Sequence, residues 1–195
     1  YDLLLTLISL VLPLATLQIQ TAAFRFLVQI RKNKESSSCV ITNILFFTII
    51  CSVIPIIVIY FSINEFSCFI RTLICLYFLF DIFLQTFQQI VRGLGKNTLY
   101  SVSTILNATI NMALLYILID VYNFGLSGVI GAITIANFFA SLFLFYKSSL
   151  AKYISFNLIS KDLTKQMILY AWPLIPNNLS SWIMTLSDRL LLSFF

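Results

Sequence analysis

Long runs without a charged side chain dominate this chain of 195 residues. A helix needs about 20 consecutive apolar residues to cross the roughly 30 Å hydrocarbon core of a bilayer. Five runs reach that length without a charge, and a sixth is interrupted only by Arg71 and Asp81. We therefore predict an all-α integral membrane protein, a polytopic bundle of six transmembrane helices in a single domain over residues 1–195. The predicted spans cover residues 3–24, 40–63, 66–91, 98–119, 126–146 and 167–192.

The composition excludes several other classes of protein. Only 10% of the residues are charged and 60% are hydrophobic, whereas soluble domains carry about 25% charge. This excludes an ordinary soluble enzyme, a disordered chain and a nucleic-acid-binding protein. Histidine, the commonest metal ligand and general base, is absent. The four cysteines lack metal-binding spacing, so we expect no metal, no cofactor and no disulfide.

Basic residues fall in alternate loops between the predicted spans. The loops after the first, third and fifth spans hold ten of the twelve Lys and Arg residues, and the other loops hold Glu65 and Asp120. Because cytoplasmic loops carry an excess of Lys and Arg, we place the basic loops in the cytoplasm. The chain opens without an initiator Met and ends inside an apolar stretch. We therefore expect a fragment of a larger transporter or channel.

Four of the spans carry polar side chains at helical spacing, so that each set lies on one helix face. Interhelical hydrogen bonds, each contributing about 0.6 kcal/mol, would explain one such stripe. Four stripes in one chain favour a shared polar cavity. The stripes are Gln18, Thr21 and Arg25; Asp81, Gln85, Gln88 and Arg92; Tyr100, Thr104, Asn107 and Asn111; and Asn177, Ser181, Thr185 and Asp188.

The fifth span has a different pattern, in which a small residue recurs every four positions. Such a ridge lets a neighbouring helix approach closely, so we interpret this span as a packing helix without a substrate role. The ridge consists of Gly128, Ala132, Ala136 and Ala140. Prolines bend helices, and Pro173 and Pro176 mark a kink or a hinge in the sixth span.

Asp81 is the most unusual single residue, because a carboxylate at the centre of a span costs about 2.5–3.5 kcal/mol. An ion pair or shared hydrogen bond within the bundle would explain it, and so would a role in coupling to a cation or proton. Asp188 is a second candidate for ion coupling. It precedes Arg189, and neighbours on a helix point about 100° apart, so the two would reach separate partners.

The segment 148–166 mixes apolar and basic residues. An interfacial helix on the inner leaflet and a plain cytoplasmic linker are equally good interpretations. Ser160 is expected to cap the helix that leads into the sixth span, with Asp162 in its first turn.

Three stretches resemble the polysaccharide-transporter branch of the MOP exporters, the Wzx-type lipid-linked oligosaccharide flippases. They are QIVRGLGKNTLYSVSTILN (89–107), GLSGVIGA (125–132) and LYAWPLIPNNLSSWIMTLSDR (169–189), of which the last is the most specific. AFRF (23–26) looks like the Arg-bearing end of the family's second helix. The resemblance covers essentially the whole chain. It implies that the chain spans helices two to seven of a two-lobed transporter, about one lobe, without the first helix and the C-terminal half.

The resemblance also implies a function. The family moves undecaprenyl-pyrophosphate-linked sugar repeat units from the inner to the outer leaflet, for O-antigen, capsule or exopolysaccharide. It implies a multi-pass protein of the bacterial inner membrane. The partners would be the lipid-linked oligosaccharide, membrane lipids and the polysaccharide polymerase machinery.

Residue chemistry supplies candidates for binding such a substrate. Arg25 and Arg189 suit the diphosphate, because guanidinium groups pair well with phosphate oxygens. The sugar-binding candidates are Asn107, Asn111, Asn177 and Ser181.

Two other functions remain open. A glycan polymerase or ligase would be an enzyme, and it would need a long outer loop, which the short segments near 62–67 and 120–125 do not provide. A gradient-driven exporter of drugs or other small molecules from the same superfamily would use Asp81. No phosphate-binding loop for ATP is present.

Overall fold

The computed structural model describes residues 16–62, 67–155, 158–180 and 183–184 of the chain. Regular structure in these residues is helical. In chain order the helices are α2 (Ile19–Ile30), α3 (Lys34–Ser62), α4 (Cys68–Gly93), α5 (Asn97–Leu115), the π-helix η1 (Tyr116–Val121), α6 (Gly125–Lys147), the 3₁₀ helix η2 (Leu150–Tyr153) and α7 (Lys161–Ala171).

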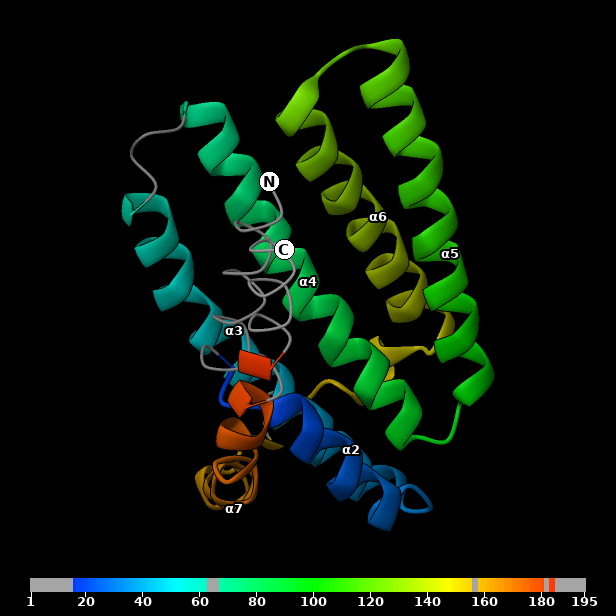
Figure 1. Ribbon diagram of the computed structural model, residues 1–195. Helices are drawn as coiled ribbons and strands as arrows, with labels where there is room; N and C mark the ends of the chain where they lie inside the picture. Colours follow the sequence, from blue (N-terminus) through cyan, green and yellow to red (C-terminus); the bar gives the residue numbers. More distant parts are fainter. Residues whose placement is uncertain (1–15, 63–66, 156–157, 181–182, 185–195) are drawn as a thin grey trace.

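Four helices among the described residues are long and apolar enough to cross a membrane. They cover Lys34–Phe61, Cys68–Gly93, Asn97–Val121 and Gly125–Lys147. Figure 1 shows α3, α4, α5 and α6 running alternately up and down, as expected of consecutive spans joined by short connections. The second to fifth predicted spans are therefore confirmed as long apolar helices, and the protein is a helical membrane protein.

The second span begins earlier than predicted. The helix starts at Lys34 rather than near residue 40. The side-chain oxygen of Asn33 accepts hydrogen bonds from the backbone nitrogens of Glu35 (3.1 Å) and Ser36 (3.4 Å). Such a cap satisfies N–H groups that have no partner within the helix, so the helix extends beyond the charge-free run.

The first and sixth predicted spans differ from the structure at their boundaries. The first lies largely outside the described residues. Its described part is a turn at 16–18 followed by α2, which continues to Ile30, so Arg25 lies within the helix. The helix thus runs beyond residue 24, where the sequence predicts the end of the span. Towards the sixth span, α7 begins at Lys161, where the Ser160 hydroxyl accepts a hydrogen bond from Leu163 N (3.4 Å). The predicted cap at Ser160 is confirmed.

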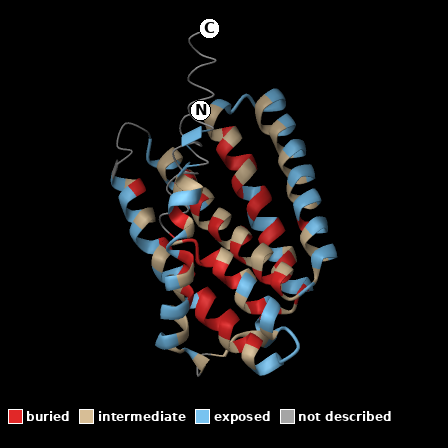
Figure 2. Ribbon diagram, turned by 60° about the horizontal axis from the view of Figure 1, so that its bottom comes forward, coloured by how far each residue is buried: buried red, intermediate tan, exposed pale blue. Residues whose placement is uncertain are grey.

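The most buried of the four long helices is α6, and α5 lies on the outside of the bundle. Buried residues recur along α2, α3, α4 and α6, and Figure 2 shows them gathered towards the middle of the bundle, whereas Ser103 is the only buried residue of α5. The small-residue ridge of α6 is buried: Gly128, Ala132, Ala136 and Ala140 all lie inside. This confirms the prediction that α6 packs closely against its neighbours.

Gly93 allows α2 to approach the end of α4. A Cβ atom added at this residue would lie only 2.7 Å from Cβ of Leu27 on α2. Leu27 is completely buried in the cluster formed by α2, α3, α4 and α7. Any larger residue at position 93 would push α2 away, so this glycine fixes where α2 lies.

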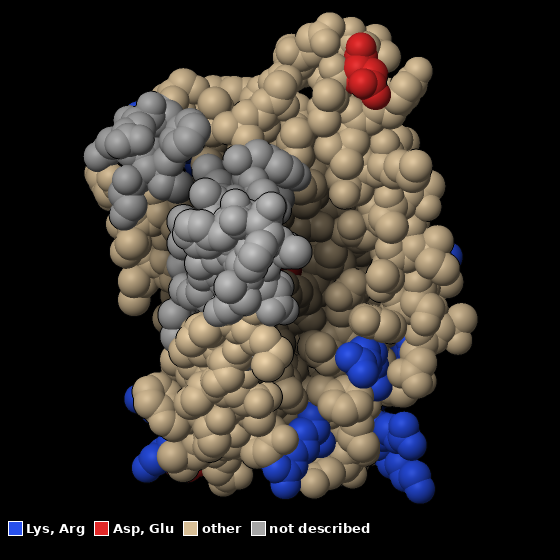
Figure 3. Space-filling view, viewed as in Figure 1, with Lys and Arg blue, Asp and Glu red and all other residues tan. Residues whose placement is uncertain are grey.

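Charge is separated between the two ends of the bundle. In Figure 3, blue surface gathers at the lower end, around α2 and the lower end of α4, and a red patch lies at the opposite end over the α5–α6 turn. Because the long helices alternate in direction, the basic loops share one end, as the sequence predicts. We call it the basic end.

Candidate functional site

Asp81 lies near the middle of α4 and accepts two side-chain hydrogen bonds. Gln85 Nε2 donates to Asp81 Oδ2 (3.0 Å) from one turn further along α4. Asn137 Nδ2 on α6 donates to Asp81 Oδ1 (3.3 Å). The carboxylate is thus held by neutral amides.

A third helix joins this group through Asn107. Asn107 Nδ2 on α5 donates to Asn137 Oδ1 (2.7 Å), so a chain of amides links α5 to α6 and to Asp81 on α4. We call Asp81, Gln85, Asn107 and Asn137 the Asp81 cluster. It joins the second and third polar stripes predicted from the sequence.

The interpretation of α6 as a packing helix alone is incomplete. Asn137 is 4% exposed and lies at the centre of the Asp81 cluster. Sequence reasoning missed it because one amide in an apolar run forms no stripe. The signal that could have found Asn137 is its polarity, because an amide buried in an apolar environment needs a hydrogen-bond partner.

Asn111, another predicted binding residue, lies one turn beyond Asn107 on α5. Its side-chain oxygen is buried and has no hydrogen-bond partner in the described part of the chain. An acceptor without a donor is costly inside a bundle. Asn111 therefore offers a free hydrogen-bond acceptor on α5, one turn from the Asp81 cluster.

Arg25 faces a different neighbour. Its guanidinium carbon lies 4.2 Å from the ring centroid of Tyr170 on α7, within cation–π range. The rest of its stripe is paired locally, since the Thr21 hydroxyl donates to Gln18 Oε1 (2.9 Å). The α2 stripe is thus directed partly towards α7 and is not part of the Asp81 cluster.

Arg92, the basic end of the Asp81 stripe, is placed between aromatic rings. Its guanidinium carbon lies 5.1 Å from the Phe24 ring centroid and 5.0 Å from that of Tyr100. Stacking of this kind leaves the N–H groups in the guanidinium plane available for other partners.

The sixth predicted span is interrupted at its first proline. Residues 172–173 form a turn between α7 and a helical segment at 174–180 that contains Pro176. Asn177 is exposed on that segment. Ser181, Asp188 and Arg189 lie outside the described residues, and so does Thr185. The roles predicted for all these residues, and a hinge at Pro173 and Pro176, stay predictions.

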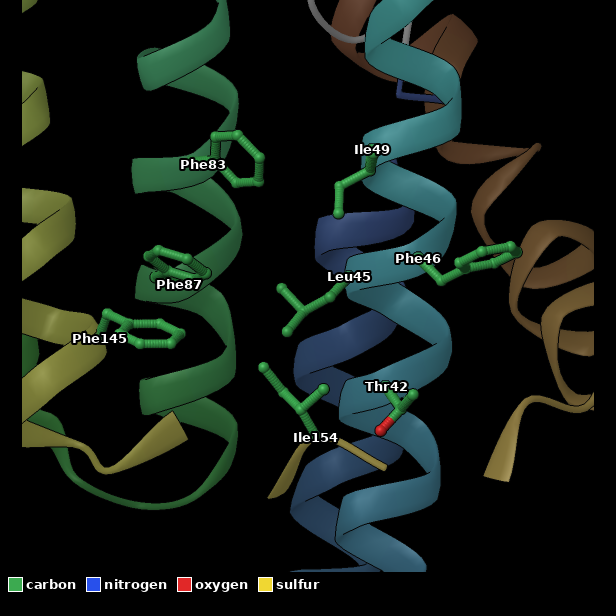
Figure 4. A pocket seen from close by; sticks show the side chains of 8 residues that line it. All are labelled: Thr42, Leu45, Phe46, Ile49, Phe83, Phe87, Phe145 and Ile154. Atoms are coloured by element: carbon green, nitrogen blue, oxygen red, sulfur yellow. The ribbon is translucent and has the colours of Figure 1, made fainter. Parts of the chain in front are cut away.

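An apolar cavity lies between α3 and the α4–α6 pair. Its volume is about 220 Å³. Figure 4 shows Phe83 and Phe87 on α4 and Phe145 on α6 facing Leu45 and Ile49 on α3 across it. Among the described residues that line it, only Thr42 has a polar side chain. This cavity therefore differs from the amide-lined space that the four stripes predicted.

Residues 148–155 and 158–160, which we call the strap, cross the basic end and are fixed to α3. The Asn43 amide donates to Leu158 O (2.9 Å), and its oxygen accepts from Ser160 N (2.8 Å) and from the Thr164 hydroxyl (3.2 Å). Thr42 next to it donates to Tyr153 O and accepts from Ser155 N, both at 3.1 Å.

Within the segment 148–166, the structure places the short 3₁₀ helix η2 and the start of α7, and both the interfacial helix and the cytoplasmic linker stay predictions. Residues Leu150–Tyr153 of the strap form the 3₁₀ helix η2. Described backbone groups of the strap take partners from α3 and, at Ser148 O, from Lys96 Nζ (3.0 Å). Sequence reasoning missed Asn43 and Thr42 because their partners lie more than a hundred residues away.

No group of three His, Cys, Asp or Glu side chains that could hold a metal ion occurs among the residues the structure describes. The chemistry available at the Asp81 cluster is therefore that of one carboxylate and three amides. Such groups can bind a cation or hydrogen-bond a polar ligand.

Comparison with known proteins gives one match. The family model described as "Polysaccharide biosynthesis protein" matches residues 1–195, which is the whole chain. No curated protein and no solved structure matches the chain.

Proposed function

Since this chain belongs to the polysaccharide biosynthesis protein family, the family of Wzx-type polysaccharide transporters, we propose that it moves a lipid-linked oligosaccharide across the membrane. The substrate would be an undecaprenyl-pyrophosphate-linked sugar repeat unit, moved from the inner to the outer leaflet of the bacterial inner membrane. The chain would contribute six spans, about one lobe of a two-lobed transporter. The observation that carries the proposal is the family match over the full chain.

Buried polar side chains between the long helices support this proposal. The Asp81 cluster gathers hydrogen-bonding groups from three apolar helices, and the free acceptor of Asn111 lies one turn away. Polar side chains at membrane depth are costly, and they commonly mark substrate or ion pathways. Sugars need amide partners of this kind.

The distribution of charge supports the direction of transport. Basic loops share one end of the bundle, which the positive-inside rule places in the cytoplasm. The membrane potential, negative inside, then favours outward movement of an anion by about 2.3 kcal/mol per charge per 100 mV. A diphosphate headgroup would therefore be moved outward with the voltage.

The short turn at the opposite end of the bundle supports transport rather than enzymatic synthesis of glycan. Only residues 122–124 separate η1 from α6. A polymerase acting on the outer face would need an ordered loop that can hold two sugar chains. The connection between these two helices is too short for that.

The test replaces Arg25 or Arg189 by Ala in cells that depend on this protein for surface glycan. We expect glycan to be lost while the protein level in the membrane stays normal, because the diphosphate would lose its cationic partner. Lys32→Ala is the matched control, since it removes an exposed charge at the basic end. Wild-type glycan output from both arginine variants would contradict the proposed phosphate contacts.

One observation favours a second candidate, a gradient-driven exporter of small molecules. Asp81 carries a carboxylate whose described partners are all neutral amides. Such a carboxylate is suited to bind a cation or a proton. Drug efflux from vesicles that is lost in Asp81→Asn would favour this candidate over oligosaccharide transport.

A further inference from the structure

A second cavity lies at the basic end, between α3 and α7, and no predicted site residue lines it. Its volume is about 380 Å³. Its apolar wall includes Phe46 and Ile50 on α3 and Ile168 and Leu169 on α7. Lys161 and Lys165, also on α7, belong to the lining as well. We call this the α3–α7 groove.

The apolar wall of the groove is open rather than packed. Phe46 is 44% exposed, Ile50 is 50% exposed and Leu169 is 65% exposed. Exposed apolar side chains gathered around a groove mark a surface that another apolar group covers. In a membrane-spanning protein, hydrocarbon chains are present at this surface.

The two lysines give the groove a positive charge. Lys161 and Lys165 are one turn apart and therefore lie on the same face of α7, and both are exposed. Asp162 lies on the same turn of α7, but neither ammonium group forms an ion pair or hydrogen bond with it or with any other described residue. The groove thus combines two uncompensated positive charges with a hydrocarbon-like wall.

The depth of the groove matches the region of lipid headgroups. α7 begins at Lys161, next to the strap that crosses the basic end, and Figure 1 shows α7 beside the lower part of α3. The Thr164 hydroxyl between the two lysines is bonded to Asn43 on α3 (3.2 Å). This bond fixes the lysine-bearing turn of α7 to the opposite wall.

We propose that the α3–α7 groove binds an anionic phospholipid of the inner leaflet, with its phosphate at Lys161 and Lys165 and an acyl chain along Phe46, Ile50 and Leu169. Charge complementarity selects an anionic headgroup, and the apolar wall requires an attached hydrocarbon chain. The groove is therefore a lipid site separate from the Asp81 cluster. The proposal does not depend on which substrate the protein transports.

The test measures lipid binding to the purified protein in detergent by native mass spectrometry. Phosphatidylglycerol is compared with phosphatidylcholine of the same acyl chains, with inorganic phosphate and with undecaprenyl phosphate. We expect phosphatidylglycerol to bind best. The proposal would be overturned if phosphatidylcholine bound as well as phosphatidylglycerol, or if inorganic phosphate alone bound as well as the lipid. Preferential binding of undecaprenyl phosphate would assign the groove to a substrate lipid instead.

The role of the positive charge is tested with the double variant Lys161→Gln/Lys165→Gln. Each lysine near an anionic surface contributes about a fivefold factor, so the pair should weaken phosphatidylglycerol binding by about thirtyfold. Lys161→Arg/Lys165→Arg keeps the charge and should keep the binding. Lys32→Gln/Lys34→Gln removes the same charge outside the groove. An equal loss in that control would show a general effect of the basic end and would overturn the site.

The apolar wall is tested separately by Ile50→Trp, which fills the groove and leaves both lysines in place. We expect phosphatidylglycerol binding to fall by tenfold or more. Ile54→Trp is the matched control, because Ile54 lies one turn further along α3, is 69% exposed and does not line the groove. Unchanged binding in Ile50→Trp, with the protein folded, would contradict a seated acyl chain.

Discussion

The Asp81 cluster and the contacts of Asn43 with the strap are two buried polar groups with different physical causes. Asn43 bonds mainly to backbone atoms: Leu158 O and Ser160 N belong to an irregular segment and have no helical partner. Asp81 bonds to side chains on regular helices whose own backbones are already paired. The fold therefore requires Asn43, whereas the Asp81 cluster is costly to a membrane protein and is not needed to pair any backbone.

This difference separates a structural polar group from a candidate functional one. Buried backbone groups must find partners, and an irregular strap has to take them from elsewhere. A carboxylate at the middle of a span is costly, and the pairing of backbone groups does not explain why it is there. Four predictions test the distinction, in decreasing order of expected effect.

Asn43→Leu should destabilise the protein by about 2–4 kcal/mol. The substitution leaves Leu158 O and Ser160 N without their partner, and each unsatisfied buried group costs about 1–3 kcal/mol. Unfolding in mixed SDS micelles measures the change, and hydrogen exchange at Ser160 should accelerate. Stability equal to wild type would mean that the strap does not depend on Asn43.

Asp81→Asn should reduce glycan transport strongly while stability stays within about 1 kcal/mol of wild type. The lost hydrogen-bond acceptor is offset by removal of a charge at membrane depth. Surface glycan and SDS unfolding are measured together. Glu35→Gln, which alters an exposed carboxylate in the first turn of α3, is the control. A stability loss as large as that of Asn43→Leu would make Asp81 a structural residue as well.

Asn107 and Asn137 should be coupled by about 0.6 kcal/mol, and by no more than about 1.7 kcal/mol, as for other side-chain hydrogen bonds in membranes. A double-mutant cycle with both changed to Ala measures the coupling. Thr109 paired with Asn137 is the control, because the Thr109 hydroxyl bonds only to Ile105 O on its own helix. Coupling of the same size in the control pair would argue against a specific contact between α5 and α6.

Thr48→Val should leave stability unchanged or raise it by up to about 0.5 kcal/mol. Thr48 is completely buried on α3, and its hydroxyl has no hydrogen-bond partner among the described residues. Replacing such a hydroxyl by a methyl group of similar shape removes a desolvation cost. A loss approaching that of Asn43→Leu would reveal a partner for Thr48 outside the described ranges.

Much of the fold could be predicted from the sequence, because its signals are local. The length of the apolar runs predicts the four long helices, although that of α4 is interrupted by Arg71 and Asp81. The four-residue spacing predicts the buried ridge of α6, and Ser160 with Asp162 predicts the start of α7. The sequence did not predict that α2 ends at Ile30 or that α3 begins at Lys34. Arg25 falls within α2, and the cap at Asn33 extends α3 past the apolar run.

The candidate site was predictable only in part. The stripes containing Asp81 and Asn107 were visible from their spacing, but the residue that joins them, Asn137, stands alone on its helix. That all four stripes line one cavity stays a prediction, because three residues of the fourth stripe, Ser181, Thr185 and Asp188, lie outside the described residues. The cavity between α3 and the α4–α6 pair is lined mainly by Phe, Leu and Ile side chains.

By itself, the sequence determined that this protein is a helical membrane protein, where its long apolar helices lie, and which end carries the positive charge. These properties follow from the transfer of each segment between water and lipid, and that transfer depends on local composition. Only the tertiary structure decided that α6 completes the Asp81 cluster, that Asn43 holds the strap, and that α7 forms a groove with α3. Each of these contacts joins residues far apart in the chain, and the direction of a polar side chain is set by the helix packed against it.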